Sequence, residues 1–447
     1  MRYCSKLSCC LLLFSCFLSL LTGCEVLGPK KLKIDGEKIP VDSSLVNYAP
    51  DPLLSKQTFS YTKSPCNCTL DLSAHNIKRT FQFNGSKNLH VVNPPLFVEN
   101  KLIFMDAHGV LQAFDLKSQK MLWSTKLILK KRSKGILFPS PDFFNGGITE
   151  HGGILYVTLG SNAVKAVNIE NGNVIWSVDL MSPTRATPVL DGQRVLIQTV
   201  DNGLYALDKS SGEVIWLHSS FDDKISVIGV VRPLIYNGYA LIQKTNEGIS
   251  AIDLRDGNEV FVIPTTISIF TSLMHAGQNL QAIQTNMVLE GDLLFFSTGE
   301  GMLGCFDLAS KKLLWDKRIS VKRQIYICGD FLYVLDQNDV LIAIFKQDGK
   351  IKWMQNLKKV YKPRDSKDFD WLAPTMINGE IIITHSAGKT FAFDSVNGEM
   401  SQNVAAALST QDGISIPIIV NNGIIYQVYG YGKIVAYGKA VDTKKLK

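Results

Sequence analysis

The sequence repeats one short unit along most of its length, and this repeat limits the possible fold more than any other feature. The unit at 203–216, GLYALDKSSGEVIW, joins an apolar run, an Asp, a turn of small residues and a closing Trp. Seven such units close at residues 123, 176, 216, 261, 315, 353 and 401, between 38 and 54 residues apart, and a truncated eighth ends at Tyr437. Short strands at a period in the forties are typical of β-propeller blades rather than of an α-solenoid.

Each unit contains the signals of short antiparallel strands joined by tight turns. In the unit that ends at Trp216 we expect strands at 187–190, 194–200, 204–208 and 214–216. The Asp-Gly and Asn-Gly pairs between them supply the positive φ that hairpin turns need. The flat closing Trp is expected to pack one blade against the next. Small residues recur at one position of the third strand and predict close packing between sheets: Ala113, Ala166, Ala206, Ala251, Gly304, Ala343, Ala392 and Ala436.

The final unit, residues 414–438, predicts three strands and has no closing outer strand. An incomplete blade would leave an open sheet edge that could pair with any passing chain. The isolated segment KRTFQF at 78–83 is the natural strand to fill this place. The predicted fold class is therefore all-β: an eight-bladed β-propeller of four-stranded antiparallel blades, closed by an N-terminal strand.

The N-terminus predicts export and lipidation. Arg2 and Lys6 precede an apolar run at about 11–21, which suits an export signal and is short for a membrane span. The sequence Leu-Thr-Gly-Cys that ends at Cys24 is similar to a bacterial lipobox. That similarity implies cleavage before Cys24, diacylglycerol on its sulfur and a further fatty acid such as palmitate on its amine. Glu25 after the Cys favours sorting to the outer membrane.

Residues 25–73 are rich in Lys, Pro, Ser and Asp and have no sustained periodicity, which predicts a tether rather than a packed element. We therefore expect four parts: a lipoprotein signal peptide at 1–23, a flexible tether at 24–73, the propeller at 74–438 and a basic C-terminal tail at 439–447.

Charge and cysteine content argue against two other classes of protein. The 47 basic and 40 acidic residues give a net charge of +7, spread along the chain without a basic and aromatic cluster, so no nucleic-acid surface is expected. Cys66 and Cys68 are too close for a tetrahedral zinc knuckle, and seven scattered His have no metal-ligand spacing. A disulfide between Cys66 and Cys68 in an oxidising compartment is the alternative for these two residues. Cys305 lies at a repeat position where other blades carry Ala, so it is expected to be a small core residue.

The repeat resembles that of pyrroloquinoline-quinone-dependent dehydrogenases, and a closer resemblance lies within that superfamily. Residues 325–344, IYICGDFLYVLDQNDVLIAI, look like the BamB family of lipoprotein propellers, with Asp336-Gln337-Asn338-Asp339 as the most specific element. The lipobox, tether, blade number and length agree, so the resemblance covers nearly the whole chain. It implies a cofactor-free scaffold, lipid-anchored at the periplasmic face of a Gram-negative outer membrane. BamB proteins dock on the periplasmic domains of the central barrel protein of the assembly complex and help unfolded outer-membrane proteins reach it.

The resemblance also marks two partner-binding loops. A family loop that reads Leu-Ser-Leu-Arg-Gly matches Ile225, Ser226, Val227, Ile228 and Gly229. A second, which carries two acidic residues near a Leu, matches Leu280, Gln281, Ala282, Ile283 and Gln284. Here Ile228 replaces the Arg and the second loop has no acid. Either the partner contact has become more apolar, or docking differs in detail; ordinary loop packing is the alternative.

Two other functions remain open at this point. A quinoprotein dehydrogenase needs a polar cofactor pocket, usually a calcium held by oxygen ligands, and an Asp base. Those enzymes also carry adjacent paired cysteines and larger blades, whereas no Cys-Cys pair remains after signal removal, so no catalytic residue is expected. The repeat aspartates suit turn capping instead: Asp115, Asp208, Asp253, Asp307 and Asp394. The other alternative is a periplasmic propeller that binds a polysaccharide or another cell-envelope ligand.

Overall fold

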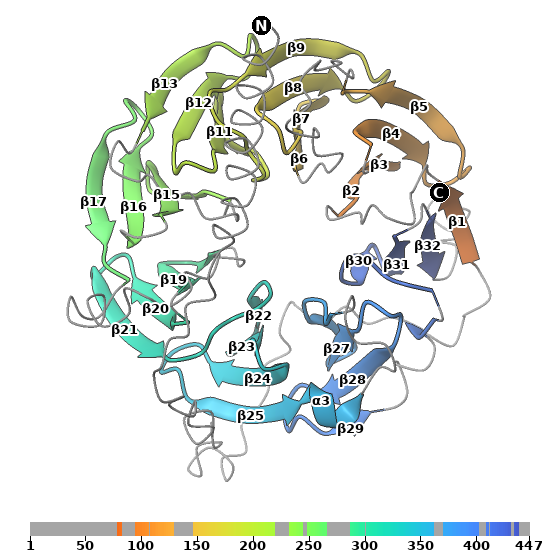
Figure 1. Ribbon diagram of the computed structural model, residues 1–447, viewed down its shortest axis with the longest axis vertical. Helices are drawn as coiled ribbons and strands as arrows, with labels where there is room; N and C mark the ends of the chain where they lie inside the picture. The colour runs from red at the N-terminus through yellow and green to blue at the C-terminus, as the bar shows by residue number, and fades with distance from the viewer. Residues whose placement is uncertain are drawn as a thin grey trace, which may run out of the picture. The chain divides into compact units, whose positions relative to one another are not determined.

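The computed structural model describes residues 78–82, 94–106, 108–128, 146–219, 232–244, 248–265, 287–299, 301–361, 370–401, 408–410, 412–430 and 433–437. All of them belong to the compact unit Pro50–Lys447. Their strands form eight four-stranded antiparallel sheets arranged as the blades of a propeller, which confirms the predicted fold class (Figure 1). The signal peptide, the tether, the basic tail, Cys24, Cys66 and Cys68 lie outside the described residues, and the boundaries of the four parts stay predictions.

Seven blades are contiguous in sequence, and in each the chain passes from an inner first strand to an outer fourth strand (Figure 1). The first four are β2 (Leu96–Val98), β3 (Lys101–Met105), β4 (Val110–Asp115), β5 (Met121–Lys126); β6 (Ile148–His151), β7 (Ile154–Thr158), β8 (Ala163–Asn168), β9 (Val174–Asp179); β10 (Val189–Asp191), β11 (Arg194–Gln198), β12 (Leu204–Asp208), β13 (Val214–His218); and β14 (Leu234–Tyr236), β15 (Tyr239–Lys244), β16 (Gly248–Asp253), β17 (Glu259–Ile263). The next three are β18 (Val288–Glu290), β19 (Leu293–Ser297), β20 (Leu303–Asp307), β21 (Lys312–Lys317); β22 (Tyr326–Cys328), β23 (Phe331–Leu335), β24 (Val340–Phe345), β25 (Ile351–Asn356); and β26 (Thr375–Ile377), β27 (Glu380–Thr384), β28 (Thr390–Asp394), β29 (Met400–Ser401).

The eighth blade closes the ring with a strand from the other end of the chain. It consists of β30 (Ile419–Asn421), β31 (Ile424–Tyr429), β32 (Lys433–Tyr437) and, outermost, β1 (Lys78–Gln82). Strand β1 pairs antiparallel with β32 along its full length, from Lys78 opposite Tyr437 to Gln82 opposite Lys433. This confirms the predicted closure by the N-terminal segment. Phe81 is buried in a cluster that joins this blade to the first one, where its ring meets that of Phe114 edge-on at 5.8 Å between centroids.

A Trp–Gly joint connects most neighbouring blades. Five closing Trp rings each donate an Nε1 hydrogen bond of 2.9 to 3.1 Å to a backbone oxygen of the next blade: Trp123 to Ile169, Trp176 to Lys209, Trp216 to Leu254, Trp315 to Lys346 and Trp353 to Ser395. Each ring lies against a turn Gly of that next blade: Gly172, Gly212, Gly257, Gly349 and Gly398. A Cβ at any of these glycines would come within 2.5 to 2.7 Å of the indole. The predicted packing role of the Trp is therefore confirmed, and the turn Gly belongs to the same contact.

At the joint between the fourth and fifth blades, both the closing Trp and the turn Gly are replaced by other residues. Phe261 takes the place of the Trp, and Lys311, with a φ of 56°, takes the place of the Gly. The Lys311 ammonium lies 5.3 Å from the centre of the Phe261 ring, which is cation–π geometry. The smaller ring leaves room for a side chain that the indole would exclude.

Strand register corrects one prediction about the small residues. The position opposite the closing Trp is held by Ala in most blades, but in the fifth blade Cys305, not Gly304, lies opposite Trp315. Counting back from Asp307 places Cys305 there, because the segment before this Asp has the same length as in the other blades. Cys305 is fully buried, as expected, and burial raises its pKa to about 12. Gly304 instead meets the ring of Phe296, which a Cβ would approach to 2.5 Å.

The repeat aspartates cap turns, as predicted. In all five, a carboxylate oxygen accepts a hydrogen bond from the backbone N–H two residues later: Lys117, Ser210, Arg255, Ala309 and Val396. These bonds hold the tight turn between the third and fourth strands. For Asp253 the Arg255 guanidinium adds to this and lowers the pKa of the carboxyl to about 2. The carboxylates therefore serve the fold.

A β-bulge interrupts the outer strand in the first six blades. The register shifts after the small residue of the third strand, between Ala113/Phe114, Ala166/Val167, Ala206/Leu207, Ala251/Ile252, Cys305/Phe306 and Ala343/Ile344. In the third blade, for example, Ala206 faces Trp216 and Leu207 faces Val214, so Ile215 is the extra residue. A bulge bends an edge strand and makes it a poor template for a further strand. The first six blades thus have protected outer edges although each ends in an open strand.

Among the described residues no helix is long and apolar enough to cross a membrane. The helix α3 (Leu357–Val360) has four residues and follows β25 directly. Asn356 caps its N-terminus by accepting a hydrogen bond of 3.0 Å from the backbone N–H of Lys358. This short helix carries Lys358 to the cluster described next.

Candidate functional site

The two predicted docking loops lie outside the described residues. Residues 225–229 fall between β13 and β14, and 280–284 fall between β17 and β18. Their role as partner-binding residues therefore stays a prediction. The other element singled out in the sequence, Asp336 to Asp339, is described in full and forms the turn between β23 and β24.

Asp336 builds this turn. One carboxylate oxygen accepts hydrogen bonds from the backbone N–H groups of Asn338 at 2.9 Å and Val340 at 2.7 Å. The Asp336 backbone N–H also donates to the Val340 oxygen at 3.0 Å. The side chain is buried, and burial raises the pKa of its carboxyl although the two N–H donors act in the opposite direction. Asp336 therefore holds the backbone, and this role explains why an Asp begins the motif.

Asp339 occupies a position that requires a left-handed backbone. Five of the turns between second and third strands share the same pair of backbone hydrogen bonds, and their fourth residues all have positive φ: Gly109 (71°), Asn202 (64°), Gly301 (85°), Asp339 (64°) and Gly388 (92°). Side chains other than those of Asn and Asp are rare in this conformation. Asp339 therefore places a carboxylate where the other turns carry a glycine or an amide.

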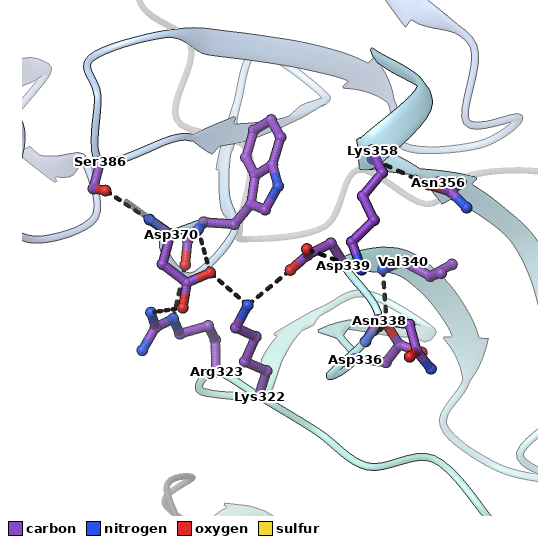
Figure 2. Close-up of polar contacts among 11 residues, drawn as sticks. Lys322, Arg323, Asp336, Asn338, Asp339, Val340, Asn356, Lys358, Asp370 and Ser386 are labelled. Carbon is purple, nitrogen blue, oxygen red and sulfur yellow. Dashed lines mark hydrogen bonds and ion pairs between the residues drawn. The ribbon is translucent and has the colours of Figure 1, made fainter. Parts of the chain in front are cut away.

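That carboxylate joins an ion-pair cluster between the sixth and seventh blades, which Figure 2 shows in close-up. The Lys322 ammonium lies 2.7 Å from an Asp339 oxygen and also contacts Asp370, which precedes the seventh blade. The other Asp370 oxygen is 2.8 Å from the Arg323 guanidinium. Lys358 approaches the second Asp339 oxygen at 3.6 Å. Each oxygen of the two carboxylates thus faces a cation.

Backbone contacts hold the cluster in place. Arg323 Nε donates to the Trp371 oxygen at 2.7 Å, and the Asp370 backbone N–H donates to Ser386 Oγ at 2.8 Å (Figure 2). The Lys322 and Asp339 side chains are each only 16% exposed, so water screens this pair weakly. The cluster therefore ties the start of the sixth blade to the approach of the seventh.

Aromatic rings pack beside the ion pairs. Buried Trp371 and His385 meet edge to face, with 4.9 Å between ring centroids, and Tyr361 and Phe391 complete the group. Burial lowers the pKa of His385, and the nearby Asp370 carboxylate opposes this only in part. The imidazole is therefore neutral near pH 7. This apolar group explains why the adjoining charges are partly shielded from water.

Sequence reasoning singled out Asp336 to Asp339 but missed Lys322, Arg323 and Asp370. No local pattern could have found them, because the cluster draws residues from 322 to 370 and only the ring of blades brings them together. Within the cluster the acidic and basic side chains pair with one another, and the Lys358 side chain stays mostly exposed. In the described part of the chain, no group of three or more His, Cys, Asp or Glu residues is arranged to hold a metal ion.

The cluster predicts a measurable contribution to stability. Lys322→Met is expected to lower the free energy of unfolding by about 1–3 kcal/mol, because it leaves Asp339 and Asp370 partly buried without their shared cation. Lys350→Met is the control, since its pair with Asp348 is exposed and such pairs contribute at most about 1 kcal/mol. Urea unfolding followed by circular dichroism measures both. Equal losses for the two variants would contradict a structural role for the cluster.

Comparison with known sequences identifies relatives of this chain. The family described as outer membrane protein assembly factor BamB matches residues 107–355. BamB of Yersinia pestis is 24% identical over 334 residues, which cover 74% of this chain and 81% of that protein. BamB of Escherichia coli K12 is 26% identical over 305 residues, covering 68% of this chain and 73% of that protein. An uncharacterized protein of Rickettsia conorii is 23% identical over 358 residues, covering 79% and 81%.

Solved structures of the same fold belong to proteins with different functions. BamB from Moraxella catarrhalis matches with a TM-score of 0.61 at 16% identity, over 81% of this chain and 98% of that one. Quinohemoprotein alcohol dehydrogenase from Comamonas testosteroni matches with a TM-score of 0.59 at 12% identity, over 84% and 78%. At these identities the likeness concerns the fold alone.

The blades, the Trp–Gly joints and the repeat define an eight-bladed propeller with the repeat of the quinoprotein class. Within that class, the matching family covers more than half of the chain, including the sixth blade up to Gln355. The chain belongs to the outer membrane protein assembly factor BamB family. This confirms the resemblance inferred from residues 325–344.

Proposed function

We propose that the chain is a non-catalytic scaffold subunit of the outer-membrane β-barrel protein assembly complex. In this proposal it docks on the periplasmic domains of the central barrel protein and assists the insertion of outer-membrane proteins. Family membership carries the proposal, because the match spans residues 107–355 and its named relatives are assembly factors. The carboxylates of the described site fit a scaffold, since Asp336 holds a turn and Asp339 and Asp370 bind Lys and Arg.

The proposal assigns docking to residues 225–229 and 280–284. An Ile at 228 and the absence of acids in 280–284 give a contact that relies on apolar burial more than on ion pairs. Apolar anchors at the centre of an interface contribute most when water is excluded from them. The partner surface should accordingly offer an apolar recess to Ile228.

The proposal also places the protein at the periplasmic face of the outer membrane of a Gram-negative bacterium, held by lipid on Cys24. The lipobox-like sequence that ends at Cys24 supports this anchor, because two or more acyl chains bind a membrane stably. Cys24→Ser should move the protein from the outer-membrane fraction to the soluble periplasmic fraction. Retention of this variant in the membrane would contradict a lipid anchor.

Calorimetric titration tests the docking assignment. The chain without residues 1–23 and with Cys24→Ser is titrated with the periplasmic domains of the barrel protein from the same cell. Ile228→Asp should weaken binding more than tenfold, about 1.4 kcal/mol, because a carboxylate cannot enter an apolar contact without loss. Ile175→Asp, at an exposed position of β9, serves as the control and should leave binding unchanged. Equal affinities of the two variants would remove 225–229 from the interface.

A further inference from the structure

The connection from β9 to β10, residues 180–188, has a backbone that is anchored throughout. Its N–H groups donate at Leu180 to Asn162 (2.8 Å), at Met181 to the Tyr205 hydroxyl (3.3 Å) and at Thr184 to Ser161 (2.9 Å). Its oxygens accept at Pro183 from Val200 (2.9 Å), at Ala186 from Thr158 (2.8 Å) and at Pro188 from Thr149 (2.6 Å). The path of this connection is therefore set by both flanking blades.

Its side chains alternate between inside and outside. Ser182 donates to Asp201, and buried Thr184 donates to the Gln198 oxygen at 2.8 Å. Met181, Pro183 and Arg185 point the other way and are exposed. The structure thus presents three exposed side chains in a row on an anchored backbone: the apolar Met181, the rigid Pro183 and the cationic Arg185.

The exposure of Met181 is unusual for this molecule. Its side chain is 87% exposed, against 55% for Met121, the next most exposed large apolar residue among those described. Arg185 makes no hydrogen bond or ion pair with any residue that the structure describes, and the nearby Asp201 is engaged by Ser182. Methionine adapts to irregular partner surfaces, and arginine is enriched where interfaces bind most strongly.

The connection also begins at the end of the blades where β13, the strand that precedes residues 225–229 in sequence, ends. Strands β9 and β13 are both outer strands, and each ends beside the turn that joins the second and third strands of its own blade. Leu180 bonds to Asn162 in one turn, and His218 at the end of β13 pairs with Leu204 next to the other. Strands β9 and β13 therefore end on one face of the propeller, and the proposed docking residues 225–229 follow β13 in sequence.

We propose that Met181, Pro183 and Arg185 form a second part of the protein-docking surface. The occupant is a protein surface with a carboxylate beside an apolar recess, because Arg185 has a charge to be matched and Met181 an apolar side chain to be covered. The identity of that protein rests on the proposed function, in which it is a periplasmic domain of the barrel protein. The family loop has an Arg at the position that is Ile228 in this chain. Arg185 then supplies the cationic contact in its place. An anchored backbone loses little conformational freedom on binding, which favours such a contact.

The titration above tests the inference with two further variants of the same chain. Arg185→Glu should weaken binding about tenfold or more, because it opposes the partner carboxylate, and Met181→Ser should weaken it about threefold or more. Both side chains are exposed, so both variants should unfold at the same urea concentration as the wild type. Arg255→Glu and Met121→Ser are the controls, since both lie by the turns at the opposite end of their blades.

The outcomes separate this inference from the proposed function. Binding by the wild type that neither Arg185→Glu nor Met181→Ser weakens would overturn the inference and leave the proposed function standing. No binding by the folded wild type would overturn the proposed function itself. Vesicles of phosphatidylethanolamine with phosphatidylglycerol are the second probe: if Arg185→Glu reduces vesicle binding and leaves the protein titration unchanged, the surface binds lipid and the inference is wrong.

Discussion

Gly257→Ala is expected to lower the free energy of unfolding by about 2–5 kcal/mol. The backbone at Gly257 has a φ of 78°, where a side chain adds about 1–2 kcal/mol of strain. The new Cβ would also lie 2.7 Å from the Trp216 indole. The ring would have to move away from Leu254, whose oxygen accepts its hydrogen bond, and overpacking of this kind adds about 1–3 kcal/mol.

Gly192→Ala separates the two contributions. Gly192 also has a positive φ, 55°, but nothing lies within 4 Å of its Cβ position. This variant should lose only the strain, about 1–2 kcal/mol. Urea unfolding followed by Trp fluorescence measures both variants. If they lose the same free energy, the contact of Trp216 with Gly257 does not hold the two blades together.

Phe81→Ala is expected to lower the free energy of unfolding by about 3–5 kcal/mol. Phe81 is 1% exposed and fills the space between the eighth and first blades, where a cavity would remain. Because β1 completes the eighth blade, this loss acts on the closure itself. Thr80→Ala, on the exposed side of the same strand, is the control and should change the free energy by at most about 0.5 kcal/mol.

Removal of the whole strand should have a further effect that Phe81→Ala does not. A chain that begins at residue 84 leaves the backbone of β32 unpaired, and unpaired edges associate with one another. Sedimentation should then reveal self-association at concentrations where Phe81→Ala stays monodisperse. A stable monomer without residues 78–82 would contradict closure by β1.

The propeller could be predicted from sequence because each blade repeats the same local chemistry. The Gly before the third strand, the Asp after it and the closing Trp serve the same turn and the same joint in most blades, so their spacing carries the fold. The missing strand of the last blade was equally visible, since KRTFQF had no other partner in the repeat. For the small-residue position of the fifth blade the sequence indicates both Gly304 and Cys305, two adjacent residues that both fit a crowded place, and strand register selects Cys305.

The ion-pair cluster and the Met181 surface could not be predicted in the same way. Lys322, Asp339 and Asp370 come together only across a blade boundary, and nothing in the local sequence pairs them. The left-handed φ of Asp339 became visible only when its turn was compared with the others. The exposure of Met181 and Arg185 follows from the anchored backbone of 180–188. That backbone bonds to the backbone of Asn162 and Ser161 and accepts from the Thr158 hydroxyl, and these residues lie in or beside the turn between β7 and β8.

The central claim is that this propeller binds the barrel protein of the assembly complex. Titration of the wild-type chain, without residues 1–23 and with Cys24→Ser, with the periplasmic domains of that protein tests it most directly. The account predicts saturable binding by the isolated, folded propeller. No binding under conditions where circular dichroism confirms the fold would contradict the docking role, and a cell-envelope ligand such as a polysaccharide would then be the better explanation of the surface.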